Sequence, residues 1–341
     1  MPHDDDTSNG WLEIVKRLEK KFDMLDDDQK EIVKDLLSNE FDYNEMMDTI
    51  WYKYDRPNYG KMSQPIAKWL KPLTQADLET EIHDICLNLA KEAKAMDKHQ
   101  VANDLKNFVF RYLAYLNNDI DDAEGFNNSE YAYPLYGIFW LMAHFHLDFL
   151  LDVAFETLKQ KSDILQFIYS MGEEETGSAI IYELGKQHMD KLDDYLRATG
   201  FIPFGKTIVF DALAYIYANE PKLKLKSLNY ISNYLRLCQK IGMDGGDMTN
   251  VDHYASTLAK VKAKETLPLL KKIYDTTEVP NIEIEDYDDL VEKMNEEEYN
   301  MEDTFILMDD IIFDIQEFAN GEFEEYPDDD IFEDLFDLDK D

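Results

Sequence analysis

The chain has 341 residues, of which 45% are apolar and 13% aromatic, so it can fill the core of two domains or of one extended array. Its 73 acidic and 34 basic residues give a net charge of −39. A negative field of this size opposes direct binding of nucleic acid or of an anionic membrane, and it favours a basic protein as the partner.

The sequence gives little indication of a targeting segment or of a cysteine-based site. The amino-terminal stretch MPHDDDTSNG is acidic and polar, which predicts neither a secretion signal nor a transit peptide. No uncharged apolar run reaches the ~18 residues that span a bilayer. Cys86 and Cys238 lie far apart in sequence, which argues against a disulfide framework and a thiolate zinc site. We therefore expect a cytoplasmic protein; the sequence leaves its oligomeric state open.

Helical periodicity dominates residues 1–128. Apolar side chains recur at intervals of three and four residues, while the period of two that marks a strand is hard to find. The stretch Asn117–Ser129, NNDIDDAEGFNNS, is polar and contains glycine, so it predicts a linker. We predict an N-terminal helical region over 1–128. Examples of its apolar stripes are Trp11, Ile14, Val15, Leu18 and Phe22, and Val101, Leu105, Phe108, Tyr112 and Leu116.

Residues 129–295 show pairs of helices. The first helix of a pair is apolar on nearly every side, as in Tyr133–Ala143 and Lys206–Ala218, and the second has a polar stripe, as in Lys222–Lys240. First helices begin near residues 134, 175, 205 and 250. Such spacings are typical of repeated helical hairpins. We predict an all-α fold in which residues 129–295 form HEAT-like α-helical hairpin repeats, an α-solenoid.

Three stretches carry a resemblance to a known family. They are EYAYPLYGIFWLMAHFHLDFLLDVAFETLKQ, DILQFIYSMGEEETGSAIIYELGKQHMDKLDDYLRATGF and VFDALAYIY. In the order of their apolar positions and turn residues they resemble the bacterial family known as domain of unknown function 1186, over roughly residues 130–295. The resemblance implies a bacterial protein with HEAT-like helical repeats, and it implies no catalytic residue.

The stretch HFHLD has the spacing His-x-His-x-Asp, which resembles part of the metallo-β-lactamase metal motif. Phe149 stands where that motif has a further histidine, and catalytic zinc needs three converging protein ligands. The alternative is a turn between packed helices, with His144 at the end of one helix and Asp148 in the first turn of the next, where the helix dipole favours each charge. We favour the turn and expect no metal, while His144, His146 and Asp148 stay weak candidate ligands.

Enzyme motifs are otherwise lacking. The sequence has no P-loop, no dinucleotide-binding glycine motif and no nucleophile elbow. We therefore expect a protein without enzymatic activity and without a cofactor.

Basic side chains gather at two places. WYKYDRPNYGKMSQPIAKWLKP, residues 51–72, interleaves them with aromatic residues, and such a mixture can stack nucleic-acid bases. Because the net charge opposes nucleic acid, we favour a packed loop region. The second place is one face of the helix predicted over Lys222–Lys240, which is either a solvated face or a docking surface for an acidic ligand. Its residues are Lys222, Lys226, Asn229, Asn233, Arg236 and Lys240.

The end of the chain is strongly acidic. Residues 281–341 hold 26 acidic and 2 basic side chains, whereas residues 222–272 hold 10 basic and 4 acidic ones. Over 296–341, which we call the acidic tail, MEDTFILMDDIIFDIQEFAN predicts an amphipathic helix and Gly321–Asp341 predicts a disordered segment that folds on a partner. The candidate partner-binding residues of the tail are Phe323, Tyr326, Phe332, Leu335 and Phe336.

Together these features favour a non-enzymatic interaction scaffold or adaptor. It would bind a basic protein partner through the helical-repeat surface and the acidic tail, and the tail would serve as a handle or as a lid over the basic helix face. One alternative is a DNA mimic that inhibits a nucleic-acid-binding enzyme. The other is a metal-dependent enzyme that uses His144, His146 and Asp148.

Overall fold

The computed structural model describes residues 52–75, 82–120, 133–169, 173–241, 250–276 and 286–295, together with Lys30, Asp48, Phe126, Val279 and Ile284. In these ranges every regular element is a helix, so the predicted all-α helical-repeat fold is confirmed. The first elements are α4 (Tyr59–Met62), η1 (Lys68–Gln75), α5 (Ile82–Ala93), α6 (Lys98–Leu116), α7 (Tyr133–His144), η2 (Asp148–Leu150), α8 (Leu151–Leu158) and α9 (Ser162–Tyr169). Then follow α10 (Glu173–Gly185), α11 (Met189–Arg197), α12 (Pro203–Asn219), α13 (Lys224–Ile241), α14 (Val251–Lys260), η5 (Lys264–Thr266), α15 (Leu267–Thr276) and α16 (Tyr287–Asn295).

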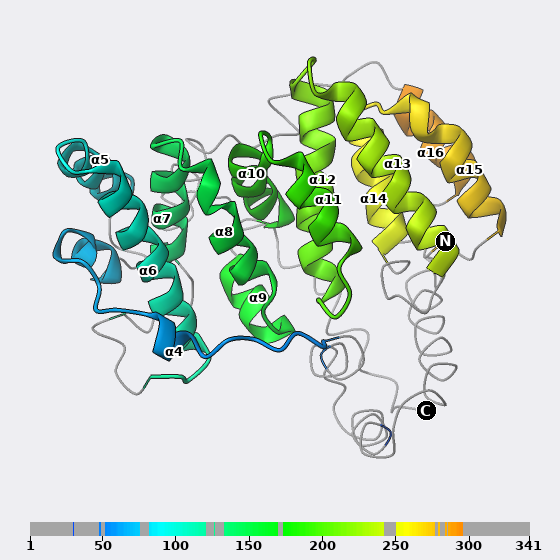
Figure 1. Ribbon diagram of the computed structural model, residues 1–341. Coiled ribbons are helices and arrows are strands. Elements are labelled where there is room, and N and C mark those ends of the chain that lie inside the picture. Colours follow the sequence, from blue (N-terminus) through cyan, green and yellow to red (C-terminus); the bar gives the residue numbers. More distant parts are fainter. Residues whose placement is uncertain are drawn as a thin grey trace, which may run out of the picture.

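The helices form two rows that run along the molecule (Figure 1). In the row at the back of Figure 1, α5, α7, α10, α12, α14 and α16 contact one another in this order. In the front row, α6 contacts α8, and α11, α13 and α15 contact one another in order. Except for α9, which follows α8 and packs like it against α10, successive helices from α5 to α16 thus alternate between the rows, as in a solenoid of helical hairpins.

The sequence of each helix matches its row. α12 lies between α10, α11, α13 and α14, and its side chains from Thr207 to Tyr217 are all buried. A helix with neighbours on several sides needs apolar residues all round, whereas a helix at the surface needs one apolar stripe. α13 has such a stripe, in which Ile231, Tyr234 and Leu235 are buried. Burial of each large apolar side chain stabilises the fold by about 1.5–3 kcal/mol.

Three turns of the described residues share one backbone design; the first follows α6, where the N–H of Asp119 donates to the carbonyl of Ala114 at 2.8 Å and Asn118 has a φ of 56°. After α7, the N–H of Leu147 donates to the carbonyl of Met142 at 2.9 Å; after α14, the N–H of Ala263 donates to Leu258 at the same distance. The residue before each donor has a left-handed backbone, with φ of 50° at His146 and 53° at Lys262. This is the Schellman pattern of helix ends. HFHLD is therefore a helix–helix turn that recurs later in the array.

Polar contacts between hairpins also recur. Each joins residues 38–48 positions apart, which is the length of one hairpin. They hold successive repeats in register. The pairs are Asp148–His188, Tyr182–Glu220, Asp190–Tyr230, Asp211–His253 and Tyr217–Glu265.

The segment before α4 runs along the lower edge of the array in Figure 1 and crosses several repeats. Lys53 N–H donates to the carbonyl of Gly200 at 2.9 Å, and the Arg56 guanidinium pairs with Asp119 at 2.7 Å.

The helices on the two sides of the predicted linker are in contact: α7 packs against both α5 and α6. The boundaries at residues 128 and 295 stay predictions. In the part of the chain that the structure describes, no helix combines the length and apolarity needed to cross a bilayer.

Candidate functional site

The turn that carries His144, His146 and Asp148 does not bring these side chains together. The His144 ring stacks on Trp140, with 4.6 Å between ring centres. His146 takes the left-handed position of the turn. The Asp148 carboxylate instead pairs with Nε2 of His188, 2.9 Å away on the next hairpin. Among the described residues, no group of three or more His, Cys, Asp or Glu side chains could hold a metal ion.

A second histidine–carboxylate pair joins α12 to α14. Nε2 of His253 lies 2.9 Å from Oδ2 of Asp211, a buried carboxylate. The Thr257 hydroxyl donates to the other oxygen of Asp211 at 2.8 Å and lies 3.5 Å from the imidazole. An imidazole that activated this hydroxyl would have to accept its proton. The hydroxyl donates to the carboxylate, so the cluster links α12 to α14.

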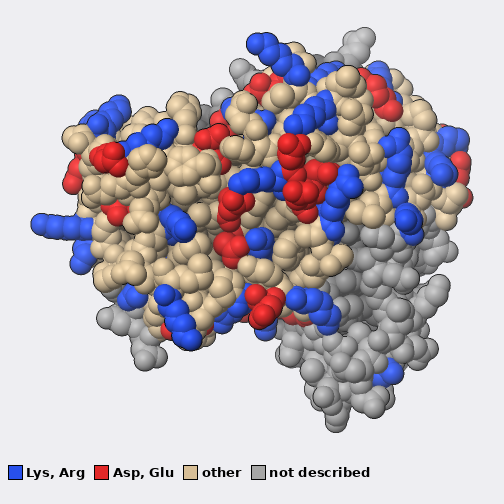
Figure 2. All heavy atoms as spheres, in the orientation of Figure 1, with Lys and Arg blue, Asp and Glu red and all other residues tan. Residues whose placement is uncertain are grey.

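The exposed face of α13 carries the predicted basic stripe. α13 contains no Asp or Glu, and the side chains of Lys226, Arg236 and Lys240 are exposed, as is that of Lys222 just before the helix. Leu225 lies beside them and is 71% exposed. Figure 2 shows Lys and Arg side chains over α13 and Asp and Glu side chains over the neighbouring α11.

Only part of this stripe is neutralised by the array itself. The Lys226 ammonium lies 3.2 Å from Asp190 of α11, and the Tyr230 hydroxyl donates to the same carboxylate. That hydroxyl lowers the pKa of Asp190, and the carboxylate raises the pKa of Tyr230 to about 12. Arg236 contacts the amide of Asn233 at 3.1 Å. Within the described ranges, three cations on this face, Lys222, Arg236 and Lys240, thus have no carboxylate partner.

Comparison of the chain with protein-family models, with curated proteins and with solved structures gave no match. The resemblance to domain of unknown function 1186 therefore stays a prediction.

The aromatic side chains of residues 52–72 are buried or half-buried, which supports the packed-region interpretation for them, whereas the basic side chains other than Arg56 are exposed. The hydroxyls of Tyr54 and Tyr59 both donate to Oε2 of Glu156, at 2.9 and 3.0 Å, and the Lys159 ammonium lies 2.8 Å from Oε1. Burial raises the pKa of both tyrosines. This cluster ties the segment before α4 to α8, so those rings do not offer a platform for stacked bases.

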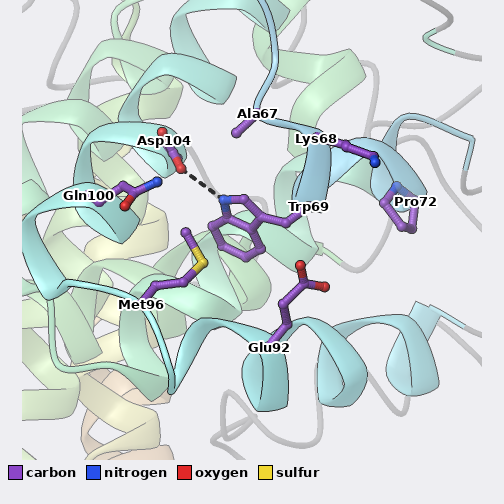
Figure 3. Close-up of a pocket in the computed structure, with 8 residues that line it drawn as sticks. All are labelled: Ala67, Lys68, Trp69, Pro72, Glu92, Met96, Gln100 and Asp104. Atoms are coloured by element: carbon purple, nitrogen blue, oxygen red, sulfur yellow. Dashed lines mark hydrogen bonds between the residues drawn. The ribbon is translucent and has the colours of Figure 1, made fainter.

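A pocket of about 540 Å³ lies where η1, α5 and α6 meet, and the sequence did not predict it (Figure 3). The indole of Trp69 and the thioether of Met96 form an apolar wall, and Glu92, Gln100 and Asp104 supply polar groups. The only sequence signal is that Gln100 and Asp104 lie four residues apart and so share a face of α6. Glu92 comes from α5, and Met96 lies in the turn between α5 and α6.

Cys86 and Cys238 are both buried free thiols. Burial raises the pKa of the Cys86 thiol to about 12, which keeps it protonated and unreactive at neutral pH. The predicted partner-binding residues Phe323, Tyr326, Phe332, Leu335 and Phe336 lie outside the described residues.

Proposed function

We propose that this protein is a non-enzymatic, cytoplasmic interaction scaffold that binds a basic protein partner through the helical-repeat surface and the acidic tail. The observation that carries the proposal is the exposed face of α13. In a chain with a net charge of −39 it presents cations without carboxylate partners among the described residues, next to the exposed apolar side chain of Leu225. A charged face of this kind attracts a ligand of opposite charge.

The occupant we assign to this face is the acidic tail of the same chain. α16 is the last described helix; it packs on α15, which packs on α13. Packed helix axes lie about 8–10 Å apart, so roughly 20 Å separates α16 from α13. The 46 residues that follow Asn295 reach well beyond that distance, since an extended chain spans about 3.3 Å per residue. Because the tail is opposite in charge to the α13 face and long enough to reach it, we assign this face as the intramolecular binding site of the tail.

A basic partner would compete with α13 for the same carboxylates. In the absence of the partner the tail covers the basic face of α13. When the partner is present, the tail leaves α13 and binds the partner. The aromatic and aliphatic side chains of Gly321–Asp341 would then order on the partner, as in segments that fold on binding.

The test is capture of proteins from a nuclease-treated lysate, followed by rebinding of the purified candidate. The baits are the full chain, a chain that ends at Asn320, and the charge reversal Lys222→Glu/Arg236→Glu/Lys240→Glu. The matched control reverses three exposed lysines outside α13, Lys61→Glu/Lys106→Glu/Lys161→Glu. We expect the full chain to capture a basic protein and the truncated chain to lose it. The variant with the α13 reversal should capture it more strongly, because the tail is no longer held on α13. The control should behave as the full chain.

Other outcomes separate the alternatives. If no purified candidate rebinds, the scaffold proposal fails. If the candidate binds DNA and DNA competes with the full chain for it, the protein is a DNA mimic. If reversal on α13 weakens capture, the helix face binds the partner itself and is not the resting place of the tail.

A further inference from the structure

The pocket between η1, α5 and α6 combines an apolar wall with two carboxylates. Figure 3 shows the Glu92 carboxylate and the Met96 thioether pointing toward the indole of Trp69, with Asp104 and Gln100 of α6 on the other side of the ring. Its volume of about 540 Å³ is ample for one long side chain. These walls limit the kinds of group that the pocket can bind.

The indole is held in place by its surroundings. Trp69 is 8% exposed and packs in the hydrophobic core, and its Nε1–H donates to Oδ2 of Asp104 at 2.8 Å. This hydrogen bond fixes the carboxylate and the ring relative to each other. A site whose groups are already oriented loses little conformational entropy when a ligand binds.

Acceptors in the pocket remain available. Among the described residues, the Glu92 carboxylate makes no hydrogen bond or ion pair, and Asp104 uses only Oδ2. Lys68 is the one cation among the lining residues, and in Figure 3 its ammonium points away from the indole. The pocket therefore presents two negative charges to a ligand, within a molecule whose net charge is −39.

A ligand that suits these walls needs an apolar stem, a flat cationic head and several donors. The arginine side chain has all three, because its guanidinium is planar, stacks on aromatic rings and carries five N–H donors for carboxylates. The ammonium of lysine lacks the flat head, and an anionic ligand would meet the two carboxylates. We infer that this pocket binds an arginine side chain of a basic protein partner. The inference rests on the proposed function for the existence of that partner.

The direct test follows the indole signal of Trp69 in the full chain. The protein has 4 tryptophans, so labelling with ¹⁵N-tryptophan gives a small set of indole N–H signals, and Trp69→Phe assigns the one of interest. The probe is acetyl-Ala-Arg-Ala-amide, titrated to millimolar concentration. The matched probe replaces arginine by citrulline, which has the same shape and no charge.

We expect the arginine peptide to shift the Trp69 signal saturably and the citrulline peptide to leave it in place. Glu92→Gln should weaken the arginine titration about fivefold, the loss of one partly exposed ion pair. Asp84→Asn is the control, because it removes the same charge from an exposed position of α5 that does not line the pocket. It should titrate as the parent protein does.

An unmoved Trp69 signal, or equal shifts with arginine and citrulline, would overturn the inference. So would equal weakening by Glu92→Gln and Asp84→Asn, since that would reveal a general charge effect. These results do not depend on the lysate experiment. If the Trp69 signal responds but no partner rebinds, the pocket inference holds and the scaffold proposal fails. If a partner rebinds but the Trp69 signal does not respond, only the pocket inference fails.

Discussion

Gly205 shows how closely the two rows approach each other. It lies in the first turn of α12, where an added Cβ would be 2.6 Å from the carbonyl oxygen of Leu158 and 2.8 Å from the hydroxyl of Tyr195. That hydroxyl donates to the same carbonyl at 2.8 Å. Backbone and a hydrogen-bonded ring cannot move aside cheaply, so only glycine fits at this contact.

We predict that Gly205→Ala lowers the free energy of unfolding by about 1–3 kcal/mol, as overpacking substitutions do. Helix propensity alone would give a gain of about 1 kcal/mol. Gly185→Ala is the comparison, since the three atoms nearest to its Cβ would all belong to the side chain of Leu192 and none to the backbone, so the cost should be smaller. Urea unfolding of both variants checks the prediction, and equal stabilities would contradict it.

His146 is the residue at which the turn interpretation and the metal interpretation diverge. Its left-handed backbone, with φ of 50°, is unfavourable for most side chains and worst for β-branched ones. We predict that His146→Val is less stable than His146→Gly by about 1–2 kcal/mol in thermal or urea unfolding. Lys262→Val and Lys262→Gly should differ by a similar amount, because Lys262 occupies the same position in its turn. A stability of the parent protein that depends on added zinc, and is lost in both His146 variants, would favour the metal interpretation instead.

At the scale of elements, the contact between α12 and η5 should depend on pH. The Tyr217 hydroxyl donates to Oε2 of Glu265 at 2.6 Å, and this hydrogen bond lowers the pKa of the carboxyl below its usual value of 4.5. A carboxyl with a lowered folded-state pKa stabilises the protein above its unfolded-state pKa, and that contribution is lost as the pH falls through the folded-state pKa.

We predict that Tyr217→Phe costs on the order of 1 kcal/mol at pH 7 and that its difference from the parent protein shrinks as the pH falls below about 4.5. Tyr195→Phe removes a hydroxyl that donates to a neutral backbone carbonyl, so its cost should not change over this range. Urea unfolding at several pH values measures both. A cost of Tyr217→Phe that is independent of pH would show that Glu265 does not accept this hydrogen bond in its ionised form.

The elements themselves were largely predictable, because each reflects local periodicity. The all-round apolar pattern of Tyr133–Ala143 and Lys206–Ala218 indicated α7 and α12. The short helix α9 was missed, as its 8 residues give too few turns for a clear stripe. The basic face of α13 was also visible, since it depends only on the period of one helix.

Features that join distant segments were not predictable. Glu156 accepts from Tyr54 and Tyr59, whose positions differ from its own by 102 and 97 residues. The Trp69 pocket likewise draws its walls from three elements. Periodicity fixes which face of a helix is buried, but not which other segment packs against it. The exposed faces of single helices could therefore be predicted from the sequence, whereas the pocket that tertiary packing forms could not.

At the scale of the whole molecule, the charge separation makes the resting place of the acidic tail testable by hydrogen exchange. If Gly321–Asp341 rests on α13, its contact with Lys222, Arg236 and Lys240 slows local opening of that helix. Exposed ion pairs contribute up to about 1 kcal/mol, so removal of this segment should speed amide exchange in α13 about fivefold. Exchange in α7, which lies at a distance in the array (Figure 1), should not change.

Salt provides the second arm of that experiment, because about 0.5 M salt screens exposed charges over a few ångströms. In the full chain it should speed exchange in α13 as truncation does, whereas in the chain that ends at Asn320 added salt should have little further effect. The reversal Lys222→Glu/Arg236→Glu/Lys240→Glu should match the truncated chain. Unchanged protection of α13 in all of these experiments would mean that the tail does not rest there, and the cations of α13 would then be left for the partner alone.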